Sequence, residues 1–221
     1  MSGLFITFEG TEGSGKSTQI DLAFRDLRAA GFKPLLVREP GSTALGEKLR
    51  EILKDPAQSS LAPEAELLLM NASRAQLVRE IILPALHQGR VVLSDRFADS
   101  TVAYQQFGRG LDPASVRNII HFATGGLSPD LTILLRVPVA LSEARRKSRS
   151  NGVPDSSDRI EDAGRAFFDR VEQGYDHIAA SAPDRVVNLD ASSPVEAVHA
   201  QVSKSIQEAL ARKKLQPLHH V

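Results

Sequence analysis

The amino-acid sequence predicts an α/β fold in which a parallel β-sheet is wrapped by helices. Short apolar runs alternate along the chain with segments whose apolar residues recur at helical spacing, which is the pattern of a parallel sheet with helical connections. A length of 221 residues suits one such domain with lobes attached better than two small domains. A glycine-rich turn between the first apolar run and the first helical segment supports the same fold class.

Five apolar runs are expected to form the strands. They lie at residues 5–8, 35–37, 91–94, 131–135 and 186–189. The first helix is expected to end at Gly31, because glycine commonly follows a helix. One face of this helix carries Ile20, Ala23, Phe24 and Leu27.

The last helix follows a Ser-Ser-Pro start signal at 192–194. Its apolar stripe is Val195, Val198, Val202, Ile206 and Leu210. The middle segment 63–87 is apolar on several sides, so we expect a helix that is buried in the core or against a second subunit. Residues 148–158, rich in Ser, Asp, Gly and Pro, predict a mobile loop rather than a linker between domains.

Composition excludes several classes of function. Lys plus Arg and Asp plus Glu number 27 each, so no overall charge favours nucleic acid or an anionic membrane. The chain has no cysteine, which excludes disulfides and thiolate metal sites. Its start does not resemble a signal peptide, and no run of about 20 apolar residues could span a bilayer. We therefore expect a cytoplasmic protein.

Residues 10–17 read GTEGSGKS, the spacing G-x-x-x-x-G-K-S of a phosphate-binding loop. An apolar run precedes the motif and a helical pattern follows it, which is the context that such a loop requires. Backbone N–H groups and the helix start would hold the anion, while Lys16 reaches the outer phosphates and Ser17 ligates Mg²⁺. The motif predicts binding of a nucleoside triphosphate, but kinases, motors, ATPases and regulators all remain open.

Two further strands end in charged residues. Asp95 follows the third strand and is expected to hold the metal through water. Arg38 follows the second strand and Arg96 the third, and strand ends of open α/β sheets converge on the ligand. Two guanidinium groups beside a triphosphate site predict a second anion, and therefore transfer onto a phosphorylated acceptor.

Four of the five residues 145–149 are basic, and DRIE follows at 158–161. Alone, the cluster would be interpreted as a solvated helix end. Beside a phosphate site, it predicts a lid at about 145–160 that brings arginines onto the migrating phosphoryl group and excludes water.

These motifs together resemble those of thymidylate kinases, which phosphorylate dTMP with ATP, and the resemblance runs from Ile6 to about Val202. It rests on EGTEG at 9–13, REPG at 38–41, ASR at 72–74, DRF at 95–97, STVAYQ at 100–105 and DRIE at 158–161. The resemblance implies a three-layer P-loop fold with a five-stranded parallel sheet, a mobile lid, ATP with Mg²⁺, and a homodimer. A single kinase domain is expected over residues 1–212, followed by a polar tail at 213–221.

The resemblance also implies roles for individual residues. The expected ATP site comprises Gly10, Thr11, Glu12, Gly13, Ser14, Gly15, Lys16, Ser17, Thr18 and Arg145, with residues 188–192 near adenine. The expected dTMP site comprises Glu12, Arg38, Met70, Arg74, Arg96, Ser100, Tyr104 and Gln105. The expected catalytic residues are Glu12, Lys16, Arg38, Arg96 and Arg149, and the expected metal ligands are Ser17 and Asp95.

Within the dTMP site, Arg38 is implied to hold the 5′-phosphate, with Arg96 near both phosphate groups. Arg74 and Gln105 are implied to read the base, and Tyr104 to pack beneath the deoxyribose. The implied target of Glu12 is the sugar 3′-hydroxyl and the metal region.

Gly13 in the loop, with basic residues at 145–149, resembles the bacterial branch of the family, which supplies its arginines from the lid. Three positions depart from the usual pattern: Met70 replaces an aromatic, Ser42 a glycine, and Arg136 an acidic residue. The stretch between Arg149 and the DRIE motif is also longer than in compact relatives.

Two other functions remain open. One is a kinase for another nucleoside monophosphate, which Arg74 and Gln105 disfavour. The other is a nucleotide-gated binding module, which would not need the second phosphate site that Arg38 and Arg96 indicate.

Overall fold

A computed structural model describes residues 3–138, 141–142, 145, 159–160 and 163–217. The strands are β1 (Leu4–Glu9), β2 (Leu35–Arg38), β3 (Val91–Asp95), β4 (Leu131–Arg136) and β5 (Val186–Asp190). They form one parallel sheet in the order β2-β3-β1-β4-β5. The predicted five-stranded parallel sheet is therefore confirmed, and each predicted strand lies within an observed one.

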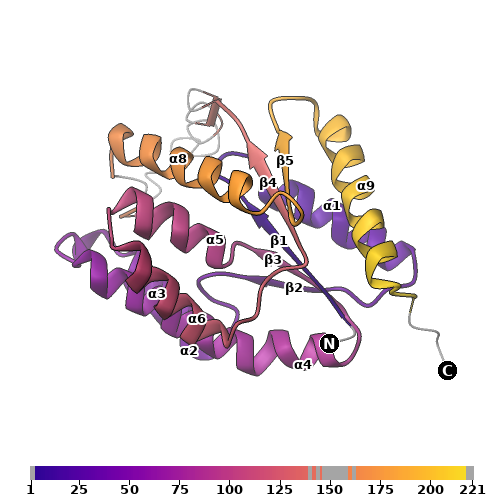
Figure 1. Cartoon of the computed structure of the whole chain (residues 1–221), viewed down its shortest axis with the longest axis horizontal. Coiled ribbons are helices and arrows are strands. Elements are labelled where there is room, and N and C mark those ends of the chain that lie inside the picture. The colour runs from indigo at the N-terminus through magenta and orange to yellow at the C-terminus, as the bar shows by residue number, and fades with distance from the viewer. Residues whose placement is uncertain (1–2, 139–140, 143–144, 146–158, 161–162, 218–221) are drawn as a thin grey trace.

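Helices surround the sheet (Figure 1). The α-helices are α1 (Lys16–Ala29), α2 (Ala44–Lys54), α3 (Pro63–Leu77), α4 (Leu83–His87), α5 (Ala98–Thr101), α6 (Pro113–Thr124), α8 (Arg165–Ser181) and α9 (Val195–Lys213). A short 3₁₀ turn η1 (Pro56–Gln58) and two π-helical segments, η2 (Val78–Ile82) and η3 (Val102–Gly108), complete them. The predicted middle helix is thus α3, η2 and α4 in succession, with a π-turn that helical periodicity did not indicate.

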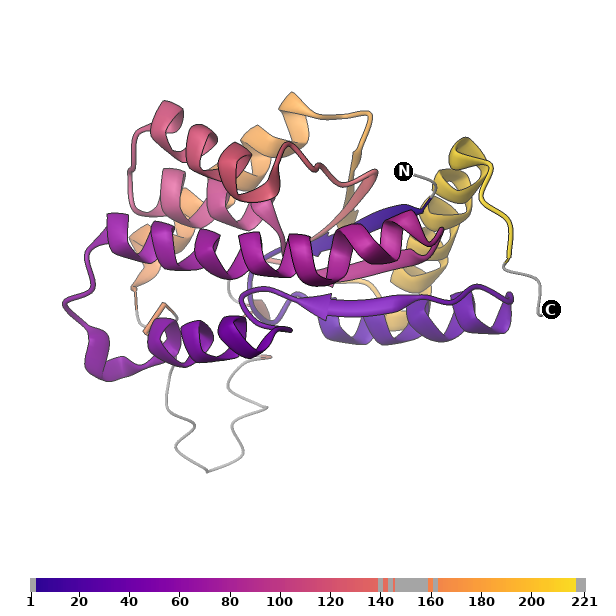
Figure 2. The ribbon, with the colours of Figure 1, turned by 90° about the horizontal axis from the view of Figure 1, so that it is seen from below.

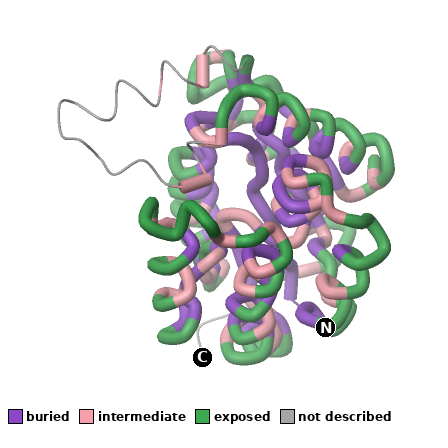
Figure 3. The backbone as a smooth tube through the Cα atoms, turned by 90° about the vertical axis from the view of Figure 1, so that its left-hand side faces the viewer, coloured by how far each residue is buried: buried purple, intermediate pink, exposed green. Residues whose placement is uncertain are grey.

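Alternation along the strands divides the core between the two faces of the sheet. Leu4, Ile6 and Phe8 of β1 pack with the helices α1 and α9, whereas Phe5 packs on the opposite face with η2 and α4. Successive side chains of a strand point to opposite faces, so a single central strand supplies both cores. Figure 3 shows the buried strands inside and the exposed faces of the helices outside.

The outer helices match the predicted stripes with one exception. Val198, Val202 and Ile206 of α9 are buried, but Val195 at its first turn is 44% exposed. Helix α9 ends at Lys213, next to the predicted start of the polar tail. Among the helices of the described segments, none is both long and apolar enough to cross a bilayer.

The carboxyl ends of the strands lie at one edge of the sheet, opposite both termini (Figures 1 and 2). Register aligns Phe8 of β1 with Asp95 of β3, and Arg38 of β2 with Asp95. The loop after β1 is therefore adjacent to the charged end of β3, as the sequence predicted.

The packing of α8 on η3 positions this edge, and Gly174 is one point of close approach between them. A Cβ atom at Gly174 would lie 2.8 Å from the Cα atom of Ala103, one residue before Tyr104. Since real Cβ atoms do not approach so closely, the glycine lets the two helices touch.

We predict that Gly174→Ala destabilises the protein by about 1–3 kcal/mol, because the helices must separate. Alanine favours a helix over glycine by roughly 0.5–1 kcal/mol, so the sign of the change separates packing from propensity. Urea unfolding measures it, with the exposed Gln173→Ala on the same helix as control. A stabilised Gly174→Ala protein would show that the contact is not tight.

Candidate active site

A cavity of about 610 Å³ lies at the carboxyl ends of the strands. Its walls include most of the predicted site residues: Glu12, Gly13, Ser14, Gly15, Lys16, Ser17, Thr18, Met70, Arg74, Asp95, Arg96, Ser100, Tyr104, Gln105 and Arg145. Gly10, Thr11 and Arg38 do not line it, and Arg149 lies outside the described residues. One cavity thus connects the predicted triphosphate and base ends.

The conformation of the phosphate loop depends on its glycines and on hydrogen bonds from its lysine. Gly10 has φ +134°, and a Cβ atom there would lie 2.3 Å from the carbonyl oxygen of Leu135. The Nζ atom of Lys16 donates to the carbonyls of Gly10 and Thr11, each at 3.0 Å. Gly15 precedes α1 and offers no side-chain cap, so the first amides of that helix are available to an anion.

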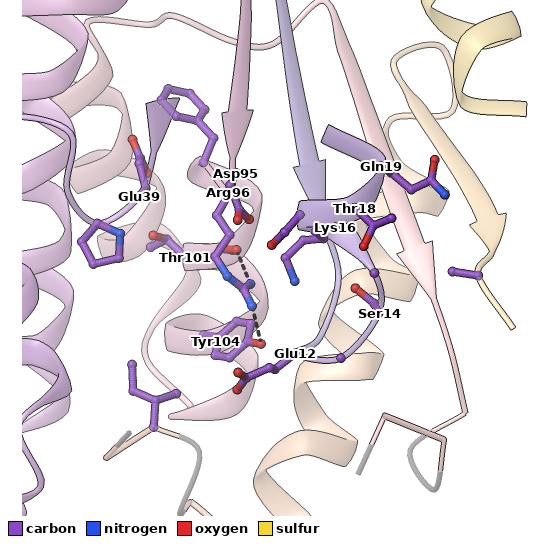
Figure 4. A pocket seen from close by; sticks show the side chains of 18 of the residues that line it. Glu12, Ser14, Lys16, Thr18, Gln19, Glu39, Asp95, Arg96, Thr101 and Tyr104 are labelled. Carbon is purple, nitrogen blue, oxygen red and sulfur yellow. Dashed lines mark hydrogen bonds between the residues drawn. The ribbon is translucent and has the colours of Figure 1, made fainter. Parts of the chain in front are cut away.

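The surroundings of Lys16 disfavour the charged form of its side chain. Burial, and secondarily the charge of Arg96, lower its pKa to about 7, although Asp95, Glu9 and Glu12 act in the opposite direction. Figure 4 shows Lys16, Arg96 and Glu12 around the same space. A polyanion in that space would restore the ammonium form.

The carboxylate at the end of β3 has one oxygen that no hydrogen bond from the described residues reaches. Asp95 Oδ1 is buried and accepts no hydrogen bond within the described part of the chain. Asp95 and the exposed Ser17 both line the cavity, and hard oxygen ligands of this kind suit Mg²⁺. Among the described residues, no group of three or more His, Cys, Asp or Glu side chains could hold a metal. This arrangement fits a magnesium ion that takes most of its ligands from phosphates and water.

Arg96 adopts a left-handed backbone conformation, with φ +71°. Its guanidinium donates to the hydroxyls of Ser100 at 2.9 Å and of Tyr104 and Tyr175 at 3.3 Å each. A non-glycine residue in this region costs roughly 1–3 kcal/mol, so the surrounding contacts must hold it there.

Glu9 provides contacts that fix the segment around Arg96, and the sequence analysis did not identify this role. Its buried carboxylate accepts from the Phe97 amide at 2.8 Å, the Ser100 hydroxyl at 2.6 Å and the Tyr175 hydroxyl at 3.1 Å. Burial, with the nearby charge of Asp99, raises the pKa of Glu9 to about 7 despite Arg96. The signal in the sequence that could have identified this role is an acidic residue directly after the first apolar run.

At the end of β2, the structure differs from the simplest expectation. Arg38 is paired with Glu47 of α2 at 2.7 Å, and its side chain is 53% exposed. Arg50, one turn further along α2, lines the cavity instead and donates to the carbonyl of Pro40 at 3.0 Å. Arg50 is a second residue that sequence reasoning missed, although it follows Glu47 at helical spacing.

The base end of the cavity contains a buried ion pair. Arg74 contacts Glu39 through Nε at 2.8 Å and through Nη2 at 2.7 Å, and both side chains are at most 4% exposed. The remaining N–H groups of Arg74 donate to Asn71, Thr101 and the carbonyl of Phe97. Arg74 therefore lies at the predicted place but is engaged by the protein itself.

The other residues predicted to contact the base or sugar also line the cavity. Tyr104 and Gln105 are buried on η3, and Met70 lies half-buried on α3, one turn before Arg74. Gln105 donates from Nε2 to Glu66 at 2.9 Å. Glu66 was not anticipated, because nothing in the local sequence marks it.

Beside the phosphate loop, Arg145 donates to the carbonyl of Ala191 at 3.1 Å and to that of Gly13 at 3.4 Å. It joins the phosphate loop to the 188–192 segment, of which Ala191 lines the cavity. Arg136 bridges Glu172 and Asp176 of α8, both at 2.7 Å, which explains a basic residue at the end of β4.

Comparisons with known proteins agree with this geometry. The family model described as thymidylate kinase matches residues 8–202. The thymidylate kinase of Desulfovibrio desulfuricans is 48% identical over 212 residues, covering 95% of this chain and 98% of that protein. The Deinococcus radiodurans thymidylate kinase is 47% identical over 206 residues, covering 93% and 97%. The crystal structure of thymidylate kinase from Ehrlichia chaffeensis superposes with a TM-score of 0.73 at 32% identity, covering 93% of this chain and 98% of that one.

The ion pairs of Glu39 and Glu47 give a matched prediction about stability. Glu39→Gln leaves the buried guanidinium of Arg74 without its carboxylate, which should cost about 3–5 kcal/mol. Glu47→Gln breaks an exposed pair and should cost about 1 kcal/mol or less. Urea unfolding of both variants measures the difference, and equal losses would contradict the structural assignment.

Proposed function

The chain belongs to the thymidylate kinase family and phosphorylates dTMP to dTDP with ATP as donor, and we propose that the two nucleotides lie end to end in the cavity described above. The observation that carries this arrangement is the continuity of the cavity. The phosphate loop and Lys16 form one end, and Met70, Arg74 and Gln105 form the other. Asp95 and Arg96 lie between them, where the γ-phosphoryl group would meet the acceptor.

The proposed reaction is in-line transfer of the γ-phosphoryl group to a 5′-phosphate oxygen of dTMP. This acceptor is already anionic, so the protein need not supply a strong base. Lys16 and the amides before α1 would hold the donor, and Arg96 would neutralise charge between the two phosphates. A magnesium ion held by Ser17 and Asp95 would neutralise charge on the triphosphate.

The acceptor phosphate requires a rearrangement of Arg38. Its pair with Glu47 is exposed on both sides, at 53% and 41%, so exchanging that partner for a phosphate costs little. A phosphate accepts two parallel hydrogen bonds from a guanidinium, which favours the exchange. Arg50 already lies at the cavity wall and would support the same anion.

The remaining contacts follow from position. Gln105 and Arg74 would face the thymine edge, Met70 its ring, and Tyr104 the deoxyribose, while Glu12 would reach the 3′-hydroxyl. Ser100 lies beside Arg96 and would support its guanidinium. The basic segment with Arg145 and Arg149 would close over the donor.

We also propose a homodimer that acts in the cytoplasm and does not bind nucleic acid. Leu68 of α3 is 56% exposed and Phe122 of α6 is 86% exposed, and both are apolar side chains that a second subunit would cover. The equal numbers of acidic and basic residues support the absence of a nucleic-acid partner. A single kinase domain over residues 1–212, with a tail at 213–221, remains part of the proposal.

The decisive experiment is ATP-dependent formation of dTDP by the purified protein, beside dUMP, dCMP and dGMP at matched ATP. We expect dTMP to be preferred, with dUMP nearest, because one methyl contact is worth only about 1–3 kcal/mol. Equal or better use of dCMP or dGMP would instead indicate a different nucleoside monophosphate kinase.

Arg38→Ala tests the acceptor end of the site. A charge-assisted bond to phosphate is worth about 1.5–3 kcal/mol, so kcat/KM for dTMP should fall by about 10- to 100-fold while KM for ATP changes little. Arg28→Ala, an exposed change on α1, is the control. An unchanged kcat/KM for dTMP would show that Arg38 stays on Glu47 throughout the reaction.

Lys16 predicts a pH dependence of ATP binding. With a free pKa of about 7, Lys16 is mostly neutral at pH 8.5, and the triphosphate raises that pKa, so binding should take up close to one proton. Affinity for ATP should accordingly fall as pH rises from 7 to 9. Titration calorimetry in buffers of different ionisation enthalpy counts the protons. Binding at pH 8.5 without proton uptake would rule out the shifted lysine.

A further inference from the structure

Glu66 on α3 forms a buried cluster behind the base end of the cavity. The side chain is fully buried and receives four hydrogen bonds, two on each carboxylate oxygen. Oε1 accepts from Gln105 Nε2 at 2.9 Å and Arg109 Nε at 3.2 Å. Oε2 accepts from Arg109 Nη2 at 2.9 Å and Arg159 Nη2 at 2.6 Å. Since a carboxylate has about four acceptor sites, the group is saturated.

The cluster keeps Glu66 ionised. Burial acts to raise its pKa, but the hydrogen bonds from Arg109, Gln105 and Arg159 outweigh burial and hold the pKa below its usual value. An ionised carboxylate only accepts hydrogen bonds. Any side-chain amide that contacts Glu66 must therefore turn its NH₂ group toward it.

The amide of Gln105 is fixed by this requirement. Its Nε2 atom faces Glu66, so its oxygen faces away from that carboxylate. Gln105 is 2% exposed and lines the cavity, so an oxygen turned away from Glu66 can accept a hydrogen bond from a group bound there. Turning the amide over would set two acceptor oxygens against each other at the 2.9 Å contact.

We infer that Glu66 is a positioning residue for base selection, because it holds Gln105 with its oxygen toward the cavity. Thymine and uracil carry N–H at ring position 3, which donates to such an acceptor. Cytosine carries an unprotonated nitrogen there, whose lone pair would face the oxygen. The inference rests on the proposed contact between Gln105 and the base, and it adds the residue that decides the polarity of that contact.

The test is the ratio of kcat/KM for dTMP to that for dCMP, with dUMP as an internal reference. In Glu66→Gln, residue 66 can both donate and accept, so the amide of Gln105 can turn over. We expect the dTMP-to-dCMP ratio to fall by about tenfold or more, since a fixed polar partner is a strong discriminator. The dTMP-to-dUMP ratio should stay unchanged, because both bases carry the same N–H. General structural damage would lower all three activities together.

Glu64→Gln is the matched control, because it makes the same change at an exposed position of the same helix. If Glu66→Gln does not fold, Glu66→Asp replaces it. Aspartate is one methylene shorter and draws the carboxylate back from all of its donors, so Gln105 loses the contact that fixes its amide and the ratio should fall in the same direction. An unchanged dTMP-to-dCMP ratio in the folded Glu66 variant would overturn the inference.

Gln105→Met separates failure of the inference from failure of the base contact on which it rests. If Gln105→Met reduces the ratio but the Glu66 variant does not, the base contact stands and Glu66 has no part in it. If Gln105→Met leaves the ratio intact, Gln105 does not read the base, and both statements fall.

Discussion

The buried carboxylate of Glu9 is the contact on which the site depends. It ends the central strand β1 and accepts hydrogen bonds from the Phe97 amide, from Ser100 and from Tyr175 of α8. These bonds keep the chain after β3 in the position that Arg96 requires, with its unfavourable positive φ. Because the phosphate loop begins at the next residue, Gly10, the same carboxylate ties the start of this loop to the segment after β3.

The charged form of Lys16 is disfavoured at this edge of the sheet. Burial and the charge of Arg96 lower the pKa of Lys16, and three carboxylates nearby offset this effect only in part. A triphosphate beside Lys16 would raise its pKa and so favour the ammonium form that binds the anion. Transfer between two anions then takes place among groups already positioned for the charge they stabilise.

Local pattern predicted the sheet and the phosphate loop well, because both depend on neighbours in the sequence. Short apolar runs and the glycine spacing mark the strands and the loop in the local sequence. Pairings between distant side chains were not predictable in this way. Arg38 turns to Glu47, and Arg136 reaches α8, through contacts that exist only after folding. The π-turns of η2 and η3 likewise arise from packing, since their sequences fit an ordinary helix.

The residues proposed to bind the base and those proposed to bind the acceptor phosphate differ in burial. Glu39 with Arg74, and Glu66 with Gln105, are buried contacts that cost solvation and fix each polar atom in one direction. Base selection needs such fixed polarity, because it turns on whether one ring position donates or accepts. Arg38, which we propose for the acceptor phosphate, is instead held in an exposed ion pair that costs little to exchange. In the proposed complex, the costly buried pairs therefore lie beside the base, where direction matters, and the exposed pair of Arg38 lies where a partner must be exchanged.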